Sequence, residues 1–282
     1  MQTPALYRKG EGERLVLIHG FTATWRCWLP VADLLSRRFE VIAPTLHGHD
    51  GGPEPPVAAH SVAHAADHFE QLLDELGVGV AHLAGNSMGG ALALELAKRG
   101  RARSVIALSP GGGWHEANTR EAKRIIRQFS INQRAARLSE PRVQALLARP
   151  RLRRLALRDV MSRGDNVPPA EAVELVRSST RCRVVENVFA TIRDGSARVV
   201  DLDRIACPVL IAWGDRDRIL PVKHHAERFR REIPGAEFRL LQGLGHTPMW
   251  DDPELVAATI GDFAQSAATP SSHGTSVPPL PA

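Results

Sequence analysis

Short apolar runs recur along the chain, and each is closed by glycine, proline or polar residues. Their length fits a strand, and their continuous apolar character is typical of strands buried on both faces of a parallel sheet. The predicted strands are residues 14–20, 39–46, 80–86, 103–109, 208–214 and 236–243. One further short strand is predicted in "PALYRK", ahead of residue 14.

Helical patterns lie between these runs, near residues 28–37, 60–76, 88–99, 222–232 and 253–265. Strands and helices that alternate in this way predict an α/β fold, in which right-handed crossovers place helices on both faces of a mostly parallel, doubly wound sheet.

The alternation breaks between residues 114 and 202, where arginine-rich helical segments replace the strands. We interpret residues 114–202 as a helical cap above a core formed by residues 1–113 and 203–266. The segment 267–282 is rich in serine, threonine and proline and lacks periodicity, so we expect it to be disordered.

Composition narrows the class of protein. The 282 residues are 43% hydrophobic, enough for one large core, and neither a secretory signal nor a run long enough to span a bilayer is present. The three cysteines form no CxxC pair, which favours reduced thiols and a cytoplasmic location. Aromatic residues make up only 5% of the chain, so we expect no nucleic acid as a partner. Because no apolar run is long enough to span a bilayer, we also expect no membrane partner.

A single serine among glycines is the strongest chemical signal. Ser87 lies in "GNSMG", between a predicted strand and a predicted helix. In the G-x-S-x-G pattern a sharp turn presents the serine hydroxyl at the carboxyl end of a strand, and Gly85 and Gly89 allow the backbone to approach closely. The alternative is a glycine-rich turn with a capping serine.

A nucleophilic serine needs a base and an acid that orients the base. His246 follows the last predicted strand in a glycine-flanked loop, and Asp215 and Asp217 follow the strand before it. His60, His64 and His68 recur every four residues, as metal ligands can, but a solvated helix face explains them more simply. The run "HGHD" at 47–50 lacks the spacing and further ligands of a metal site, so we expect no metal.

The order Ser87, Asp217, His246 resembles the α/β-hydrolase fold family, as do "HGF" after an early strand and "GDRDRILP" before a helix. The resemblance covers residues 3–266. It favours Asp217 over Asp215, because the family's acid stands third after a glycine and four before a proline. It also implies an oxyanion hole formed by the backbone N–H groups of Phe21 and Met88, with His19 beside the pocket bracing the loop.

Two departures from the family pattern change the expectation. Asp50 stands where many relatives have a glycine, so the loop over the pocket is expected to differ. Only one short strand precedes residue 14 where the family usually has two, so we expect seven strands and not eight.

The resemblance implies a serine hydrolase that cleaves a carboxylic ester or lactone of a small, largely apolar molecule, without a cofactor. Trp114 and Met249 would line its substrate pocket with the side chains of Phe21 and Met88, although all four could be plain core. "GNSMGG" also resembles the elbow of serine enzymes that cleave carbon–carbon bonds in dienone acids. A third alternative is a protein that binds ligands without turnover.

The cap carries twelve arginines between residues 120 and 163 that would suit an acidic carrier protein as partner. The simpler interpretation is a solvated helix surface with acidic neighbours.

Overall fold

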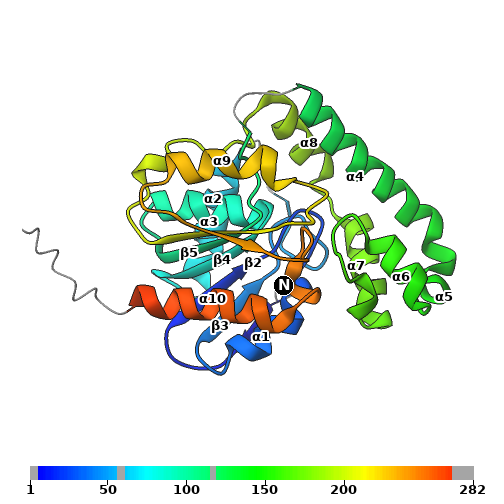
Figure 1. The fold of residues 1–282 in the computed structure, drawn as a ribbon, viewed down its shortest axis with the longest axis horizontal. Helices are drawn as coiled ribbons and strands as arrows, with labels where there is room; N and C mark the ends of the chain where they lie inside the picture. The colour runs from blue at the N-terminus through cyan, green and yellow to red at the C-terminus, as the bar shows by residue number, and fades with distance from the viewer. Residues whose placement is uncertain (1–5, 56–60, 115–118, 269–282) are drawn as a thin grey trace, which may run out of the picture.

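A seven-stranded sheet forms the centre of the computed structural model, which describes residues 6–55, 61–114 and 119–268 (Figure 1). The strands are β1 (Leu6–Lys9), β2 (Arg14–Ile18), β3 (Glu40–Pro44), β4 (Ala81–Asn86), β5 (Ala102–Leu108), β6 (Val209–Gly214) and β7 (Glu237–Leu241). Their order in the sheet is β1-β3-β2-β4-β5-β6-β7, and only β1 is antiparallel to its neighbour. The predicted α/β class and the seven strands are therefore confirmed.

Alternate residues of each strand contact different helix layers, because successive side chains point to opposite faces. Val16 and Ile18 of β2 pack with α2 (Val62–Glu75), α3 (Met88–Lys98) and α9 (Val222–Glu232). Leu15 and Leu17 of the same strand pack with α1 (Leu29–Leu35) and α10 (Pro253–Ala268). Both faces are covered, which explains why the strands are continuously apolar.

A helical insertion follows β5 and ends before β6, as expected. It contains α4 (Thr119–Ser139), α5 (Val143–Leu147), α6 (Pro150–Leu157), α7 (Pro169–Arg181) and α8 (Val185–Asp194). Figure 1 shows α4 to α7 to one side of the sheet, with α4 and α8 side by side. Val143, Leu147 and Leu157 share a small apolar core with Val173 and Trp250, so the insertion is fastened to the loop before α10. The proposed boundaries at 114 and 202 stay a prediction.

Helix α10 extends further than its pattern predicted. It ends at Ala268, so Ala267 and Ala268 are helical although they fall in the segment expected to be disordered, because alanine favours a helix strongly. Residues 269–282 lie outside the described part of the chain. Within the described ranges, every helix is too short or too polar to cross a bilayer.

Candidate active site

Ser87 occupies a sharp turn between β4 and α3. Its backbone has φ 55° and ψ −116°, a conformation rare for any residue but glycine. A Cβ on Gly85 would lie 2.1 Å from the carbonyl oxygen of Gly89, and one on Gly89 would lie 2.2 Å from that of Ile18. The turn therefore forms only with glycine at both positions, as the motif predicted.

The carboxylate of Asp217 and the imidazole of His246 form a buried pair. The Asp217 Oδ2 lies 2.7 Å from the Nδ1 of His246, and its Oδ1 accepts the backbone N–H groups of Ile219 (2.9 Å) and Leu220 (2.8 Å). Both side chains are about 95% buried. A carboxylate opposite Nδ1 fixes the proton there and leaves the Nε2 lone pair available as a base.

Asp215, the other candidate acid, does not contact His246 in the described structure. Asp215 is exposed, and its carboxylate accepts the backbone N–H of Gly243 at 2.7 Å. The structure thus pairs His246 with Asp217, the residue that the family spacing favoured.

Asn86 connects the loop of His246 to the serine turn. Its Nδ2 donates to the carbonyl oxygens of His246 (2.8 Å) and Leu108 (3.1 Å). Because Asn86 immediately precedes Ser87, these bonds hold the histidine loop against the serine. Asn86 was not among the predicted site residues, because its only signal in the sequence was its place inside the G-x-S-x-G pattern.

Asp251 fastens the same loop to the cap, and it too was absent from the predicted site residues. Its carboxylate is 1% exposed and accepts three backbone N–H groups, from Gly245 at 2.7 Å, Ser162 at 3.0 Å and Arg163 at 2.6 Å. Gly245 precedes His246, whereas Ser162 and Arg163 belong to the insertion. The two consecutive acids in "MWDDP" were the only hint in the sequence.

The loop after β2 runs along the serine turn. A Cβ on Gly20 would lie 3.2 Å from the Cβ of Ser87. His19 is buried, with Nδ1 2.8 Å from the Gly20 oxygen and Nε2 accepting the Leu46 N–H at 2.9 Å. Burial lowers the pKa of His19 well below its ordinary value. A neutral imidazole with both nitrogens engaged braces the loop, the part expected of His19.

The two expected oxyanion donors, Phe21 and Met88, directly follow Gly20 and Ser87 in the chain. Met88 is the first residue of α3, where backbone N–H groups have no acceptor within the helix. Within the described part of the chain, the Phe21 N–H has no hydrogen-bond acceptor. Their role as an oxyanion hole stays a prediction.

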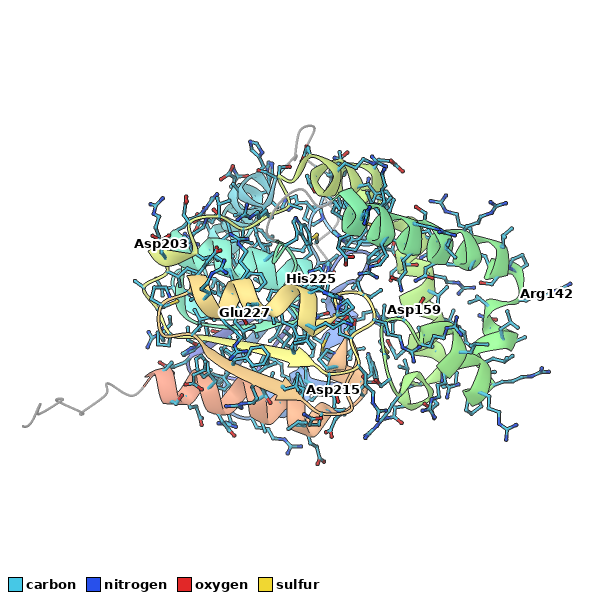
Figure 2. All side chains as sticks on the ribbon, turned by 45° about the horizontal axis from the view of Figure 1, so that its top comes forward. Arg142, Asp159, Asp203, Asp215, His225 and Glu227 are labelled. Atoms are coloured by element: carbon cyan, nitrogen blue, oxygen red, sulfur yellow. The ribbon has the colours of Figure 1, made fainter. Side chains whose placement is uncertain are left out.

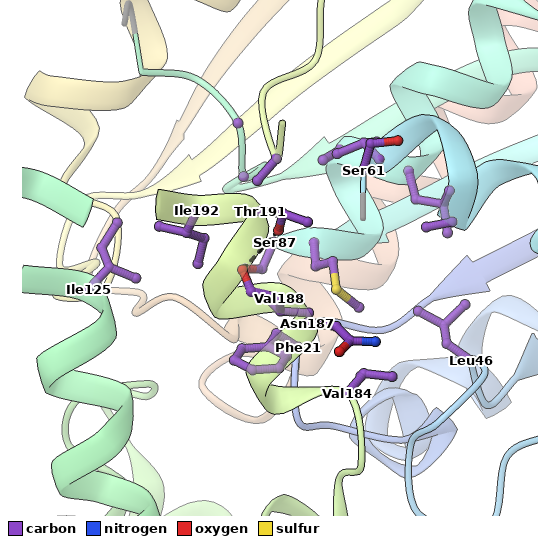
Figure 3. A pocket seen from close by; sticks show the side chains of 18 of the residues that line it. Phe21, Leu46, Ser61, Ser87, Ile125, Val184, Asn187, Val188, Thr191 and Ile192 are labelled. Atoms are coloured by element: carbon purple, nitrogen blue, oxygen red, sulfur yellow. Dashed lines mark hydrogen bonds between the residues drawn. The ribbon is translucent and has the colours of Figure 1, made fainter. Parts of the chain in front are cut away.

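An apolar cavity of about 170 Å³ opens at Ser87. Phe21, Met88 and Trp114 line it as expected, and the cap adds the apolar side chains Ile125, Phe129, Val184, Val188 and Ile192. Figure 3 shows α8 passing in front of Ser87, and Val188 and Ile192 of this helix line the same cavity as Ser87. Neither lysine nor arginine occurs among its described lining residues.

Two residues expected at the pocket lie outside it. Met249 is fully buried in the core beneath the sheet, because the short turn at Pro248–Trp250 directs it toward α1 and α10. That expectation was wrong. His19 does not line the cavity either, since its ring is held behind the loop by its two hydrogen bonds.

The histidine stripe on α2 gathers no metal ligands. His64 bonds Ser61, and His68 lines the cavity with its ring 5.6 Å from that of His47. No group of three or more histidine, cysteine or acidic side chains suited to a metal occurs among the described residues, and His60 lies outside them.

Asp50, the departure in the loop over the pocket, contacts the cap. Its carboxylate lies 3.4 Å from Arg181 of α7, and nearby Glu54 pairs with Arg183 at 2.5 Å. This loop is therefore tied to the insertion by ion pairs.

The sheet, the serine turn and the Asp217–His246 pair together define an α/β hydrolase. A profile described as the Alpha/beta hydrolase family matches residues 15–259, and the chain belongs to this family.

Individual relatives span several chemistries. A Mycobacterium tuberculosis protein named epoxide hydrolase EphH is 30% identical over 208 residues, which is 73% of this chain and 95% of that one. Two similar structures share the fold at 24% and 22% identity. One is a membrane phospholipase A described as a bacterial virulence factor, with TM-score 0.74 and coverage of 94% and 83%. The other is an esterase from Thermogutta terrifontis, with TM-score 0.68 and 94% of each chain covered.

Proposed function

We propose that this protein is a serine hydrolase that cleaves a carboxylic ester or lactone with a small, largely apolar acyl group. One observation carries the proposal. The buried Asp217–His246 pair is tied through Asn86 to a strained serine turn, and that serine opens into an apolar cavity.

The residues suit a reaction in two covalent steps. His246 takes the Ser87 proton at Nε2 as the hydroxyl oxygen attacks the substrate carbonyl, and Asp217 stabilises the imidazolium that forms. The N–H groups of Phe21 and Met88 would bind the oxyanion. The imidazolium then protonates the leaving alkoxide, and a water that His246 deprotonates releases the acid. These steps need no cofactor.

Chemistry favours an ester over an epoxide, although one relative is named an epoxide hydrolase. Attack by a serine oxygen on an epoxide carbon would form an ether, which has no carbonyl for water to attack. An acyl-serine ester has one. A serine at the turn therefore supports acyl transfer.

The cavity lining argues against the carbon–carbon hydrolase alternative. Dienone acids carry a carboxylate, which proteins commonly hold with arginine. The described lining is apolar apart from histidine, serine, threonine and asparagine side chains. An uncharged acyl group fits this surface better.

The test is hydrolysis of p-nitrophenyl esters of increasing acyl length by wild type and Ser87→Ala, with fluorophosphonate labelling alongside. We expect a burst of nitrophenol, a preference for short to medium acyl chains, and near-complete loss of turnover and labelling in Ser87→Ala. Labelling at Ser87 without turnover of any ester would reject the substrate class and favour carbon–carbon cleavage. Neither labelling nor turnover would favour the non-catalytic alternative.

A further inference from the structure

Positive charge is concentrated in one short part of the cap. Residues 119–158 contain twelve arginines and lysines against two acidic residues, a net charge of +10, whereas the whole chain has +5. The rest of the chain is therefore net negative. Twelve of the 36 basic residues lie in this segment, on α4 (Thr119–Ser139), on α6 (Pro150–Leu157) and in the residues that flank α6 and α5.

Most of these cations lack an acidic partner. Among the residues that the structure describes, eight make no ion pair: Lys123, Arg127, Arg134, Arg137, Arg142, Arg149, Arg151 and Arg153, the last of which is buried and donates to backbone carbonyl oxygens. On the core, by contrast, one arginine, Arg99, contacts both Asp67 and Glu70 at 2.7 Å. The expectation of a helix surface balanced by acidic neighbours does not describe this part of the cap.

Apolar side chains are exposed among the same cations. The described chain has eight exposed large apolar residues, and four of them fall in this segment: Ile131 (55%), Leu138 (74%), Leu146 (37%) and Leu155 (55%). On α4 the exposed residues Arg127, Ile131, Arg134 and Leu138 follow one another at helical spacing, so they share one face. We call these four residues the α4 stripe.

The opposite face of α4 belongs to the catalytic cavity. Ile125 and Phe129 line that cavity, and the Phe129 ring lies 5.1 Å from the Phe21 ring. A surface groove beside the stripe has four cations and one acid in its lining, which consists of Arg120, Lys123, Arg124, Arg127, Gln128, Ile131, Asn132 and Asp159. Figure 2 shows Arg142 at the far tip of the cap, where nitrogen-tipped side chains project away from the core.

We propose that the α4 stripe and its groove dock on an anionic lipid surface. Arginines bind lipid phosphates, and aliphatic side chains between them enter the boundary of the acyl chains, which is the composition of helices that lie on a membrane. An acidic protein would satisfy the cations but gives no reason to expose Ile131 and Leu138. The proposal departs from the expectation of no membrane partner, which rested on the lack of a spanning segment, whereas surface docking needs none.

Docking would bring the cavity wall formed by α4 close to the lipid. If the proposed function holds, the ester substrate would be taken from the membrane, and only this consequence rests on the proposed function. The docking itself is independent of catalysis.

The experiment is co-sedimentation with vesicles of phosphatidylcholine, alone or mixed with phosphatidylglycerol. Wild type and Ser87→Ala should both pellet with the anionic vesicles, remain in solution with the neutral ones, and be released by salt. Arg127→Glu with Arg134→Glu, and separately Ile131→Ser with Leu138→Ser, should each weaken binding at least about tenfold.

Matched controls use exposed residues outside the basic segment 119–158. Arg37→Glu with Arg239→Glu, and Val200→Ser with Leu255→Ser, should bind like wild type. The four double variants should keep wild-type hydrolysis of a soluble ester, since none of their residues lines the cavity. If ester hydrolysis is absent from wild type but vesicle binding follows this pattern, only the proposed function fails.

Two results would overturn the docking proposal. One is failure of the wild-type protein to pellet with the anionic vesicles. The other is full binding by the serine double variant while the glutamate double variant loses it, because the surface would then recognise charge alone, as an acidic protein partner would require.

Discussion

Ser87 is held in a costly backbone conformation by the residues around it. A positive φ at a residue with a side chain costs about 1 to 3 kcal/mol. Its N–H donates to Leu108 at 2.9 Å, and its carbonyl accepts the N–H groups of Ala91 at 3.1 Å and Gly111 at 2.9 Å. With both backbone polar groups bonded to neighbouring elements, the turn is fixed before substrate arrives.

The carboxylate of Asp217 is predicted to matter for rate and little for folding. In Asp217→Asn the amide oxygen can still accept the Ile219 and Leu220 N–H groups, but an amide cannot stabilise the imidazolium as a charge does. We expect kcat to fall by about 10⁴. Ester hydrolysis measured beside the melting temperature checks this, and the melting temperature should change by only a few degrees.

Asp215→Asn is the control for this prediction. Asp215 is two residues away, exposed, and bonded only to the Gly243 N–H among the described residues, a bond that asparagine can keep. Its kcat should stay within about twofold of wild type, since surface substitutions rarely have larger effects. Equal losses in the two variants would contradict the assignment of Asp217 as the acid.

At the scale of elements, Asp251 joins the histidine loop to the insertion. Asp251→Ala would leave three backbone N–H groups without an acceptor: the buried one of Gly245, at a cost of about 1 to 3 kcal/mol, and the part-buried ones of Ser162 and Arg163, which cost less because water can reach them. We therefore expect a lower melting temperature, faster proteolysis within the insertion, and a lower kcat, because the loop that carries His246 loses one anchor. Limited proteolysis with mass spectrometry, together with ester kinetics, measures both effects.

The neighbouring carboxylate provides the matched control. Asp252 accepts the Leu255 N–H at 3.0 Å at the start of α10, and asparagine fills such a position equally well. Asp252→Asn should behave like wild type. If Asp251→Ala melts earlier but keeps wild-type kcat and an intact insertion, the carboxylate contributes to stability alone.

Elements that depend on local pattern could be predicted from the sequence, and side-chain direction in loops could not. The continuous apolar runs predicted β4 and β6, because a strand that is buried on both faces has apolar residues at consecutive positions. Met249 was placed in the pocket because it is close to His246 in the chain, but the turn at Pro248–Trp250 points it into the core. The bonds of Asp251 were invisible because they join residues almost ninety positions apart.

At the scale of the whole molecule, buried neutral histidines set the response to acid. Burial lowers the pKa of five described histidines: His19, His47, His49, His82 and His225. In the unfolded chain these histidines bind a proton near pH 6.5, whereas in the folded protein they bind one only at lower pH. Their contribution is therefore complete above about pH 6.5 and is lost as the pH falls toward the folded-state pKa values.

For His49 the expected loss of unfolding free energy in acid can be given a magnitude. Burial lowers its pKa from 6.5 to about 4, which corresponds to about 3 kcal/mol of stability lost across that interval. We expect the free energy of unfolding in urea to fall steeply between pH 7 and pH 4.5 in wild type. The fall should be smaller by about that amount in His49→Gln, whatever its stability at pH 7.

His224→Gln separates burial from histidine content. His224 is exposed beside buried His225, so its substitution lowers the histidine content without removing a buried ring, and the pH dependence of stability should be unchanged. A wild-type unfolding free energy that is flat from pH 7 to 4.5 would mean that water or a local opening admits protons to the buried rings.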